Sequence, residues 1–552
     1  MRYNIIIAIL ISNFLVSANS YNNMIGKNKK TLVSSVNNVD QKVNEFAKVP
    51  LDADLTYLTP NQKQIIPILI KVADIMDNIF WKQTFGSKDS LLNYIEDANL
   101  KQFVEINYGP WENFNNNESF ISGIGKKPLG SRFYPEDMTD DEFEKLNDER
   151  KNSWYSIIVR DKQNNLQVIS YGEAYKEELK KASDLLLEAS KLCEDIELKK
   201  YFELRSKALL TDDYLESDLA WMDMKNNVID FVVGPIEQYE DALYGTKTAY
   251  SGQILVKDIE WSNKLSKINS YLQNLQKTLP VDDKYKTEKV NDNSDINVYN
   301  LIYSAGDCNS GGKNIAINLP NDPRVHEKKG TRKLQLKNAI KAKFDKILLP
   351  ISNILIAEEQ RKYIKFDAFF ENVMFHEIAH GMGIKNTING KGTAREALKA
   401  TYQPIEEGKA DILGLYLITK LTEMGEMGEK DLMDNYVTFM AGIFRSVRFG
   451  AASPHGKANM IRFNYFQECK AFTRDSVTGL YKVNFEKMKE AVVSLSKEII
   501  IIQGNGDVEA AQKLIDEKGN IKEELQKDLD KIAKSGIPRD IVYEQGLKYI
   551  KL

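Results

Sequence analysis

The sequence contains few of the residues that build disulfides or cysteine-based sites. It has 3 cysteines among 552 residues. Cys193, Cys308 and Cys469 lie far apart, and no pair has the CxxC spacing. The sequence therefore predicts neither a disulfide framework nor a metal or redox centre held by cysteines.

An excess of one charge is also missing. The chain has 75 Lys and Arg against 79 Asp and Glu, which gives a formal net charge of -4. This balance predicts no broad basic surface, so nucleic acid is not an expected partner. With 42% hydrophobic and 28% charged residues, the composition is that of a globular protein long enough for two or more domains. Nothing in the sequence indicates an oligomeric state.

Long apolar runs are absent after the amino terminus, where one short run occurs. Arg2 precedes the apolar residues 5–11, and the small residues 18–20 precede Tyr21. This order resembles a secretory signal peptide spanning residues 1–20. A membrane anchor is the alternative, but the run is short for a bilayer span and Asn13 interrupts it. We therefore expect export to the periplasm or the extracellular space, with no stable membrane insertion after cleavage.

Composition and periodicity divide the rest of the chain into three parts. Residues 21–51 are polar and lack a helical period, which predicts a linker or arm. Residues 52–334 mix helical and strand patterns, and residues 335–552 are almost wholly helical. The predicted fold class is α+β and predominantly helical, and the prediction leaves open whether the C-terminal segment returns to the first lobe.

Several segments have a clear secondary-structure pattern. Long amphipathic runs at residues 61–83 and 173–209 predict helices. The β-rich runs 154–160 and 166–171, joined by a turn, predict a hairpin. Further strand-like pieces lie at residues 226–233, 252–256 and 314–319.

The strongest chemical pattern is the pentapeptide HEIAH at residues 376–380, within the predicted buried helix 366–384. Histidines four apart lie one turn apart on one face, so both rings can bind one Zn²⁺ at about 2.0–2.1 Å. Glu377 lies beside this pair and can take a proton from a zinc-bound water. The alternative is that His376 and His380 are two core histidines. A chance match is rare in a chain with 4 histidines, so we predict one zinc per chain.

A catalytic zinc needs a third protein ligand, and a second acidic segment supplies a candidate. Starting 24 residues after His380, Pro404 opens a predicted helix that carries Glu406, Glu407 and Asp411. Glu407 and Asp411 lie one turn apart, so Glu407 can bind the metal while Asp411 accepts a ring N–H from a ligand histidine. Glu406 is assigned with Asp411 to the groups around the ligands. The alternative is an acidic first turn favoured by the helix dipole.

Both motifs together resemble the zinc centre of the dipeptidyl peptidase III family, in which a glutamate supplies the third ligand. The segment 234–241 looks like the family segment whose tyrosine helps to stabilise the tetrahedral intermediate and whose glutamate helps to hold the substrate amino terminus. Tyr239 and Glu237 stand at those positions. The resemblance therefore implies a catalytic role for Tyr239 and a substrate-binding role for Glu237.

Two more segments carry the same resemblance. Residues 317–321 are similar to the family's Ile-Asn-x-Pro-Asn stretch, whose asparagines bind the first residues of the substrate, which implies that role for Asn318 and Asn321. Residues 453–459 resemble the segment with a further active-site histidine, which is His455 here. By themselves, the asparagines beside Pro320 would be read as turn formers.

The sequence departs from the family pattern at two places. Much of the family has six residues, His-Glu-x-x-x-His, whereas this chain has the five-residue spacing of a shorter bacterial-type branch. Asn459 replaces the family's arginine four residues after the active-site histidine. Basic residues that could take over the binding of the substrate carboxylate are Arg445, Arg448, Lys457 and Arg462.

The resemblance implies a fold and an activity. The fold is two lobes with a wide cleft, one mainly helical with the zinc and one mixed with a small barrel-like sheet. The activity is removal of dipeptides from the amino terminus of peptides, with Glu377 activating a zinc-bound water and with Tyr239 and His455 stabilising the oxyanion. The substrate is then a peptide, and the cofactor is Zn²⁺.

Other functions are compatible with the same residues. A zinc endopeptidase or an aminopeptidase would use this centre with a different cleavage register. An exported zinc-containing binding protein would keep the metal without turnover. Residues 395–398 match part of the Nudix pyrophosphatase signature, but the paired acids that should follow to bind magnesium are absent, so that function is not predicted.

Overall fold

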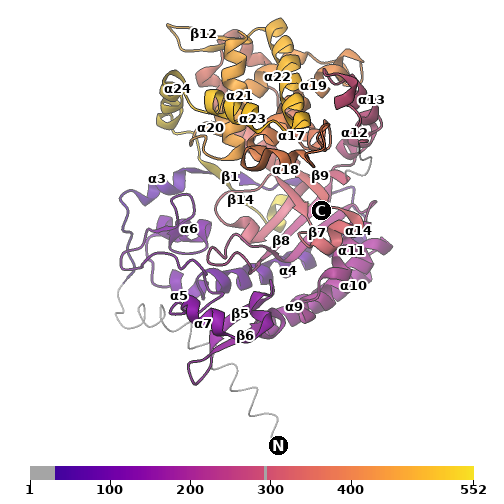
Figure 1. Ribbon diagram of the computed structural model, residues 1–552. Helices are drawn as coiled ribbons and strands as arrows, with labels where there is room; N and C mark the ends of the chain where they lie inside the picture. Colours follow the sequence, from indigo (N-terminus) through magenta and orange to yellow (C-terminus); the bar gives the residue numbers. More distant parts are fainter. Residues whose placement is uncertain (1–30, 291–294) are drawn as a thin grey trace, which may run out of the picture. The chain divides into compact units, whose positions relative to one another are not determined.

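The chain forms two compact units, each described here by itself. The computed structural model describes residues 31–290 and 295–552, so the expected signal peptide 1–20 lies outside the described residues. Unit 1 comprises residues 1–258, 298–339 and 540–552, and unit 2 comprises residues 259–297 and 340–539. Helices predominate over strands, which confirms the predicted fold class (Figure 1).

The division differs from the predicted boundary between residues 334 and 335. Helix α12 (Ile259–Asn269) belongs to unit 2, because Trp261 packs against Phe370 with ring centroids 4.7 Å apart. Residues from Asp540 onward belong to unit 1. Both assignments depend on contacts between residues distant in sequence, which local composition does not reveal.

The predicted linker at 21–51 is structured over its described part. Helix α3 (Val39–Asn44) is followed by strand β1 (Phe46–Pro50), and Val43 and Phe46 are buried. Strand β1 pairs in parallel with β14 (Asp540–Glu544). A short polar segment gains its order here from a strand near the other end of the chain, so from residue 31 onward the expectation of a loose arm is corrected.

The main sheet of unit 1 has five strands in the order β10-β11-β9-β8-β7. Its central pairs β7–β8 and β8–β9 are antiparallel, and so is the pair β10–β11. No pairing among the described strands joins β7 to β10, so the sheet is open where a barrel-like one was expected. Strand β10 ends at Leu319, and the following Pro320 has no amide hydrogen to extend the ladder.

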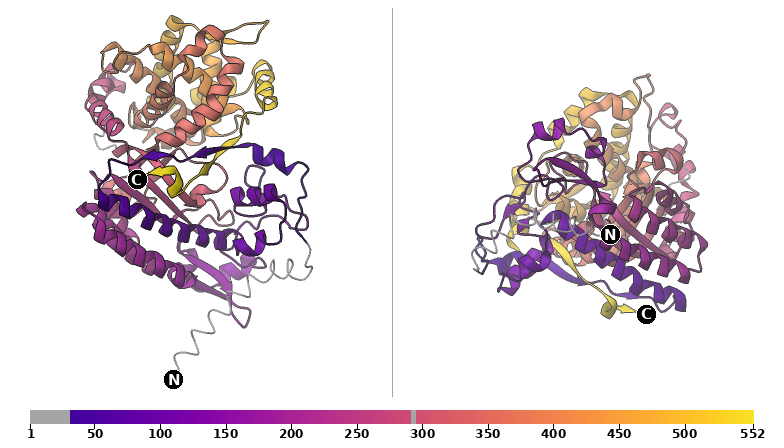
Figure 2. Two further views of the ribbon diagram at one scale, coloured as in Figure 1. Left: turned by 180° about the vertical axis from the view of Figure 1, so that it is seen from behind. Right: turned by 90° about the horizontal axis from the view of Figure 1, so that it is seen from below.

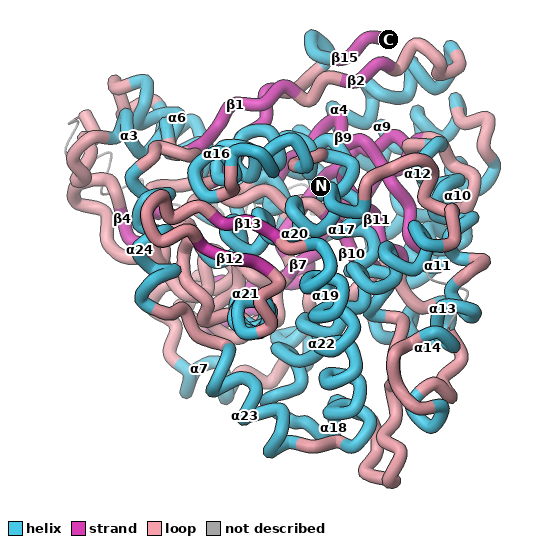
Figure 3. Tube along the Cα trace, turned by 90° about the horizontal axis from the view of Figure 1, so that it is seen from above, coloured by secondary structure: helices cyan, strands magenta, loops and turns pink. Residues whose placement is uncertain are grey.

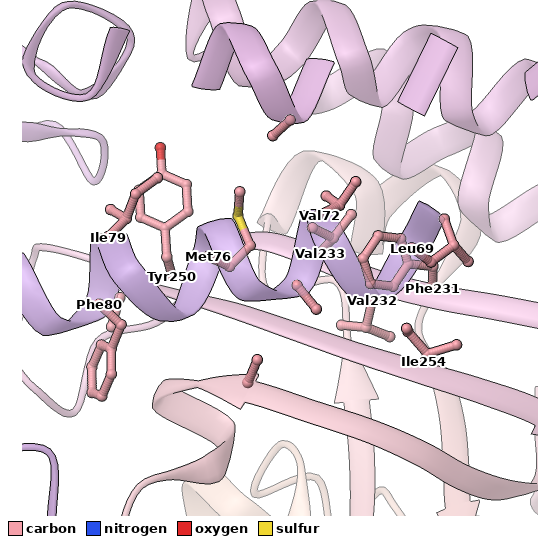
Figure 4. Packing of buried hydrophobic residues seen from close by; sticks show 14 of the residues in the cluster. Leu69, Val72, Met76, Ile79, Phe80, Phe231, Val232, Val233, Tyr250 and Ile254 are labelled. Carbon is pink, nitrogen blue, oxygen red and sulfur yellow. The ribbon is translucent and has the colours of Figure 1, made fainter. Parts of the chain in front are cut away.

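The core of unit 1 lies between this sheet and helix α4 (Pro60–Thr84). Thr59 caps the helix in a capping box with Gln62. Figure 4 shows apolar side chains of α4 and of strands β7 and β8 in this core. Gly252 lets the strand approach the helix, because a Cβ there would lie 3.0 Å from Ala73 Cα. Burial of each such aliphatic side chain contributes about 1.5–3 kcal/mol, so this layer adds substantially to the stability of unit 1.

The remaining helices of unit 1 cover the sheet and the N-terminal segment. Helices α9 and α10 run side by side, and α9 packs on α4 (Figure 2). The predicted helix 173–209 is interrupted between residues 192 and 196, where Asp195 caps α10. The α-helices are α3 (Val39–Asn44), α4 (Pro60–Thr84), α5 (Lys88–Leu92), α6 (Ala98–Asn107), α7 (Asp140–Lys145), α8 (Tyr171–Ala174), α9 (Lys176–Leu192), α10 (Ile196–Thr211), α11 (Leu215–Asp223) and α14 (Pro323–Lys329), and the 3-10 helices are η1 (Glu149–Asn152), η3 (Asp307–Asn309) and η7 (Leu547–Tyr549).

The strands of unit 1 include the predicted hairpin, which is confirmed by the antiparallel pairing of β5 with β6. Strands β9 and β11 were not predicted. The strands are β1 (Phe46–Pro50), β2 (Ala53–Asp54), β3 (Trp111–Glu112), β4 (Glu118–Ser119), β5 (Ser156–Arg160), β6 (Leu166–Ser170), β7 (Ile229–Glu237), β8 (Ala249–Lys257), β9 (Asp295–Gly306, whose first residues belong to unit 2), β10 (Ala316–Leu319), β11 (Arg332–Leu336), β14 (Asp540–Glu544) and β15 (Ile550–Lys551).

Unit 2 is mainly helical, as the sequence predicts for residues 335–552. It also contains one small hairpin, which was not predicted. Helix α19 packs against α17, α21 and α22 and is buried on several faces (Figure 3). Its elements are α12 (Ile259–Asn269), α13 (Leu272–Thr278), η2 (Asp283–Tyr285), α15 (Lys337–Lys343, which contains the unit boundary), the π-helix η4 (Phe344–Leu348), α16 (Leu349–Leu355), η5 (Glu358–Tyr363), α17 (Phe366–His380), α18 (Ala394–Leu398), η6 (Lys399–Thr401), α19 (Tyr402–Glu423), α20 (Leu432–Val447), α21 (Pro454–Glu468), β12 (Phe472–Arg474), β13 (Tyr481–Val483), α22 (Phe485–Asn505), α23 (Val508–Lys518) and α24 (Glu523–Lys534).

Within the described ranges, none of the helices is both long enough and apolar enough to span a bilayer.

Candidate active site

Helix α17 carries the two histidines of the pentapeptide at its C-terminal end. The helix is largely buried through the apolar side chains of Phe369, Phe370, Met374 and Phe375. His376 and His380 then lie on one face, with their Nε2 atoms 3.2 Å apart and the ring centroids 4.7 Å apart. The two Nε2 atoms therefore face a common point. Because both histidines are only half-buried, this point stays accessible.

Glu407 of α19 completes the group. Its Oε2 lies 3.4 Å from His376 Nε2 and 3.7 Å from His380 Nε2. This oxygen is buried and has no hydrogen-bond partner among the described residues. One ligand atom from each of the three side chains lies within 4.8 Å of the others. A buried carboxylate oxygen without a donor, facing two imidazole nitrogens, fits a metal ion with two nitrogen ligands and one oxygen ligand.

The close packing of α17 and α19 allows this arrangement. Gly414 lies two turns after Glu407, and a Cβ at this glycine would lie 2.9 Å from Phe375 C and 3.0 Å from His376 N. Real Cβ contacts are almost never that short, so only glycine permits the observed spacing. The distance between the helix that carries the histidines and the helix that carries the glutamate is thus fixed by backbone contact.

Each histidine is also held from behind by a carboxylate. His376 Nδ1 lies 2.7 Å from Asp411 Oδ1, and His380 Nδ1 lies 2.9 Å from Glu406 Oε1. These contacts fix which ring nitrogen is free to face the metal. Asp411 and Glu406 therefore lie behind the two histidines, on the side of the rings away from the Nε2 atoms.

Two cations act on these carboxylates. Burial by itself would raise the pKa of Asp411, but the charge of Arg462 and the hydrogen bond to His376 hold that pKa well below its usual range. Burial likewise opposes ionisation of Glu406, whereas the charge of Lys409 and the hydrogen bond to His380 hold the pKa of Glu406 well below its usual range. Both groups are therefore ionised at neutral pH.

Glu377 and His455 lie around the same group. Glu377 is half-buried on α17. Burial lowers the pKa of His376, but the charge of Asp411, and to a smaller degree that of Glu377, raises this pKa above its usual value. His455 is the second residue of α21, and its Nδ1 lies 3.2 Å from Glu407 Oε2. The His455 side chain is 63% exposed, so it can meet a ligand from solvent. Unit 2 therefore brings together all five predicted residues of the metal and proton chemistry: His376, Glu377, His380, Glu407 and His455.

The predicted peptide-binding residues belong to unit 1. Glu237 ends strand β7, and burial raises its pKa while a hydrogen bond with Asn321 lowers it. Asn321 Nδ2 donates to the Ile236 carbonyl oxygen at 3.1 Å. Asn318 is exposed on β10, and Tyr239 is 86% exposed. The structure thus joins Glu237 with Asn321, and it places Asn318 and Tyr239 at exposed positions of the same unit.

The position of the missing family arginine has a different function in this chain. Asn459 is buried, and its side-chain amide donates to the His455 carbonyl oxygen at 2.8 Å and to Ser446 Oγ at 3.0 Å. It therefore supports the first turn of α21. Of the four basic residues considered as replacements, Arg462 is buried against Asp411 and is not available to a peptide. Arg448 donates to the carbonyl oxygens of Pro538 and Arg539.

Sequence reasoning missed the cationic partners of the two carboxylates. Lys409 follows Glu406 by three residues, a helical spacing that could have identified the pair. Arg462 follows His455 by seven residues on one helix, but only the fold shows that it meets Asp411. Gln503, whose Nε2 donates to Glu406 Oε2 at 2.9 Å, lies on α22 and has no local signal in the sequence.

Comparisons with known proteins identify the family of the chain. The sequence model of Peptidase family M49 matches residues 146–393. The structure of DPP III from Caldithrix abyssi is 37% identical, with a TM-score of 0.86 over 92% of this chain and 99% of that one. The structure of dipeptidyl-peptidase III from Corallococcus sp. strain EGB is 33% identical, with a TM-score of 0.72 over 92% of this chain and 96% of that one.

A relative from Arabidopsis thaliana carries another name. This protein, Nudix hydrolase 3, is 34% identical over 571 residues, which cover 91% of this chain and 73% of that protein. In the present chain, the partial Nudix match lies in the short helix α18, where Glu396 forms a capping box with Thr393. In this chain Glu396 therefore stabilises the start of α18, and the name Nudix hydrolase 3 describes the relative only.

The fold and the group of two histidines and a glutamate define a metallopeptidase. The chain belongs to peptidase family M49, and it is a peptidase of the dipeptidyl peptidase type.

Proposed function

We propose that the protein is a zinc-dependent exopeptidase that releases dipeptides from the amino terminus of peptides. The observation that carries the proposal is the group of His376, His380 and Glu407, in which each histidine is backed by its own carboxylate. Two neutral imidazoles and one carboxylate are a ligand set of catalytic zinc sites. One zinc ion per chain would be held by these three residues.

Residues of unit 2 would transfer the proton and stabilise the negative charge that develops on the carbonyl oxygen. When bound, zinc lowers the pKa of a water molecule towards about 7 and polarises the carbonyl of the scissile bond. Glu377 accepts a proton from the attacking water and then passes it to the amine that leaves. His455 donates a hydrogen bond to the carbonyl oxygen as negative charge develops on it, a contribution of the kind worth about 10²–10³ in rate.

Residues of unit 1 would hold the peptide. The resemblance to the family assigns the free amino group to Glu237, the first residues of the peptide to Asn318 and Asn321, and a second hydrogen bond to the developing oxyanion to Tyr239. Asn321 donates to the carbonyl oxygen of Ile236, the residue before Glu237, and this proximity supports a joint role of Glu237 and Asn321. A carboxylate that recognises a free amine makes cleavage depend on the amino terminus, which is the basis of an exopeptidase.

The test is digestion of peptides of four to eight residues with free and with acetylated amino termini, with and without a chelator. Mass spectrometry should show dipeptides released in succession from the free peptides, no cleavage of the acetylated ones, and no products with the chelator. Activity should return on addition of Zn²⁺.

The alternatives give different products. Single residues would indicate an aminopeptidase, and internal fragments from acetylated peptides would indicate an endopeptidase. Peptide binding without products in the zinc-loaded protein would indicate a binding protein, and the proposed activity would then be wrong.

We also propose export, which is supported by the order of Arg2, the apolar residues 5–11 and the small residues 18–20. Expression in a Gram-negative host followed by fractionation should yield a periplasmic protein that begins at Tyr21. Cytoplasmic protein that retains residues 1–20 would contradict this proposal.

A further inference from the structure

The two carboxylates behind the metal histidines are each paired with a buried cation. Arg462 Nη1 lies 2.5 Å from Asp411 Oδ2, and the Arg462 side chain is 2% exposed. Lys409 Nζ lies 2.9 Å from Glu406 Oε1, and the Lys409 side chain is 3% exposed. Each histidine therefore ends a chain of imidazole, carboxylate and cation. A long cationic side chain is rarely buried to this degree without a specific partner.

Such a cation has a defined physical effect on the carboxylate. Glu407 faces the Nε2 atoms of the two histidines, whereas Asp411 and Glu406 contact their Nδ1 atoms on the other side of the rings. A carboxylate without a fixed partner behind it is free to rotate away from the imidazole that it contacts. A cation that is fixed by burial keeps the carboxylate aimed at the imidazole, and this contact keeps the ring in its orientation as a ligand.

The two cations differ in what else they hold. Lys409 also donates to the carbonyl oxygens of His380 and Met382, so it closes the end of α17. Arg462 lies 5.4 Å from the Phe439 ring centroid, and Asp411 is its carboxylate partner. Arg462 stands on α21, two turns after His455. The contact between Arg462 and Asp411 thus links the helix of His455 to the carboxylate that holds His376.

We propose that Arg462 is a positioning residue that fixes the His376 ligand through Asp411 and anchors the helix that carries His455. It does not bind the carboxylate of the substrate. This inference rests on the proposed zinc site. The residues that carry it all belong to unit 2.

The first experiment measures metal affinity in Arg462→Met, by competition for Zn²⁺ with a chromophoric chelator. We expect binding about 10–100-fold weaker than in the wild type, the usual effect of removing a group behind a metal ligand. The matched control is Arg474→Met. Arg474 pairs with the buried Asp528, with Nε–Oδ2 at 2.7 Å and Nη2–Oδ1 at 3.0 Å, and that carboxylate also accepts from Tyr481 and Lys531.

The control variant loses an Arg–Asp pair, with the arginine partly buried and the aspartate fully buried, that contacts no metal histidine. It should unfold at a lower temperature but bind Zn²⁺ as tightly as the wild type. Equal metal affinity in Arg462→Met and Arg474→Met would overturn the proposal. Because the measurement needs no peptide, its result is independent of whether the enzyme releases dipeptides.

A double-mutant cycle tests the route through Asp411. If Arg462 acts through this carboxylate, Arg462→Met should weaken Zn²⁺ binding by less than about 2-fold when Asp411→Asn is already present. Two independent effects that multiply would show that Arg462 acts by another route, and the proposal would be wrong.

The substrate-binding alternative is tested with two forms of one peptide, with a free and with an amidated carboxyl terminus. A positioning role predicts that Arg462→Met lowers kcat by the same factor for both forms at saturating Zn²⁺. A rise in KM confined to the free acid would assign Arg462 to the substrate carboxylate and overturn the proposal.

Arg462→Lys keeps the charge and protects the test against misfolding of the methionine variant. Lysine lacks the planar guanidinium, so partial rescue is expected, with Zn²⁺ affinity between those of the wild type and of Arg462→Met. If Arg462→Met does not fold, Arg462→Lys should still bind Zn²⁺ about 3–10-fold more weakly than the wild type. Wild-type affinity in the folded Arg462→Lys protein would then count against the proposal.

Discussion

The residues predicted for metal and proton chemistry and those predicted for peptide binding have different surroundings. In unit 2, the buried Oε2 of Glu407 faces two imidazoles, and each imidazole is fixed by a carboxylate and a cation. In unit 1, Tyr239 and Asn321 are exposed, and Glu237 is half-buried. The first set is organised before any ligand arrives, whereas the second set is open to one. The difference predicts that substitutions in unit 2 act on metal binding and rate. In unit 1, substitutions of Glu237 and Asn321 should act on peptide recognition, whereas those of Tyr239, which we assign to the oxyanion, should act on rate.

The largest effect is expected for Glu377→Gln. Glutamine cannot accept the proton of the water, so hydrolysis should fall by about 10²–10⁴ in kcat. Zinc content and melting temperature should stay close to wild type, because the three ligands are unchanged. Kinetics together with metal analysis provides the measurement. Loss of zinc, or activity near wild type, would contradict the role assigned to Glu377, and Glu359→Gln at an exposed ion pair on unit 2 is the control.

A smaller effect is expected for Tyr239→Phe. If the hydroxyl stabilises the oxyanion, kcat should fall by about 10²–10³, and the KM should change little. Because the side chain is 86% exposed, the melting temperature should not change. Tyr57→Phe, at a tyrosine that is 56% exposed in the same unit, is the matched control and should retain full activity. Equal activity of both variants would remove Tyr239 from the reaction.

The next effect concerns recognition of the amino terminus. Glu237→Gln keeps the shape of the side chain and removes its charge, so kcat/KM for a peptide with a free amine should fall by about 10–100-fold, mainly through KM. Asn321→Ala should act in the same direction, and the double variant should lose less than the product of the single effects because Asn321 is held beside Glu237 by its bond to the Ile236 carbonyl. Strictly multiplicative losses would show that the two residues act separately.

The smallest effect compares two partly buried carboxylates. Arg462 lowers the pKa of Asp411, whereas burial raises the pKa of Asp212 to about 6 against the hydrogen bonds from Gly172 and Ser170. A raised folded-state pKa contributes stability below pH 4 that is lost as the pH rises to about 6. Asp212→Asn should therefore be more stable than the wild type at pH 7.5, by about 1–3 kcal/mol, and should gain less at pH 4.

Urea unfolding at both pH values measures the effect of Asp212→Asn. The residue has φ 58°, a conformation that asparagine tolerates well, so backbone strain should not mask the result. A stability gain of Asp212→Asn over the wild type that is smaller at pH 7.5 than at pH 4 would contradict the raised pKa of Asp212.

The grouping of His376, His380 and Glu407 was predictable because its information is local. His376, Glu377 and His380 lie within five residues of one helix, and Glu407 and Asp411 lie one turn apart on another. Helical spacing alone therefore indicates which side chains share a face. The same holds for the hairpin β5–β6 and for helix α4, where the alternation, the turn and the capping box are contained in one segment.

The remaining features depend on contacts between distant segments. Strand β1 was expected to be a linker, because its partner β14 lies near the opposite end of the chain. Arg462 was considered a ligand for the substrate carboxylate, because sequence does not show that α21 turns this side chain towards Asp411. The open sheet has the same origin, since nothing local determines whether the edge strands β7 and β10 pair.

The glycine at position 414 gives the metal site an unusual sensitivity. Its missing methyl group sets the separation of α17 and α19, because a Cβ would come within 2.9 Å of the backbone beside His376. Relief of that clash would need a shift of about 0.5 Å or more, whereas metal–ligand bonds tolerate about 0.2 Å. A single carbon atom, two turns away from the glutamate ligand and without any polar group, could therefore tune metal affinity. Substitutions at this position would change the separation of α17 and α19 without replacing any of the ligands.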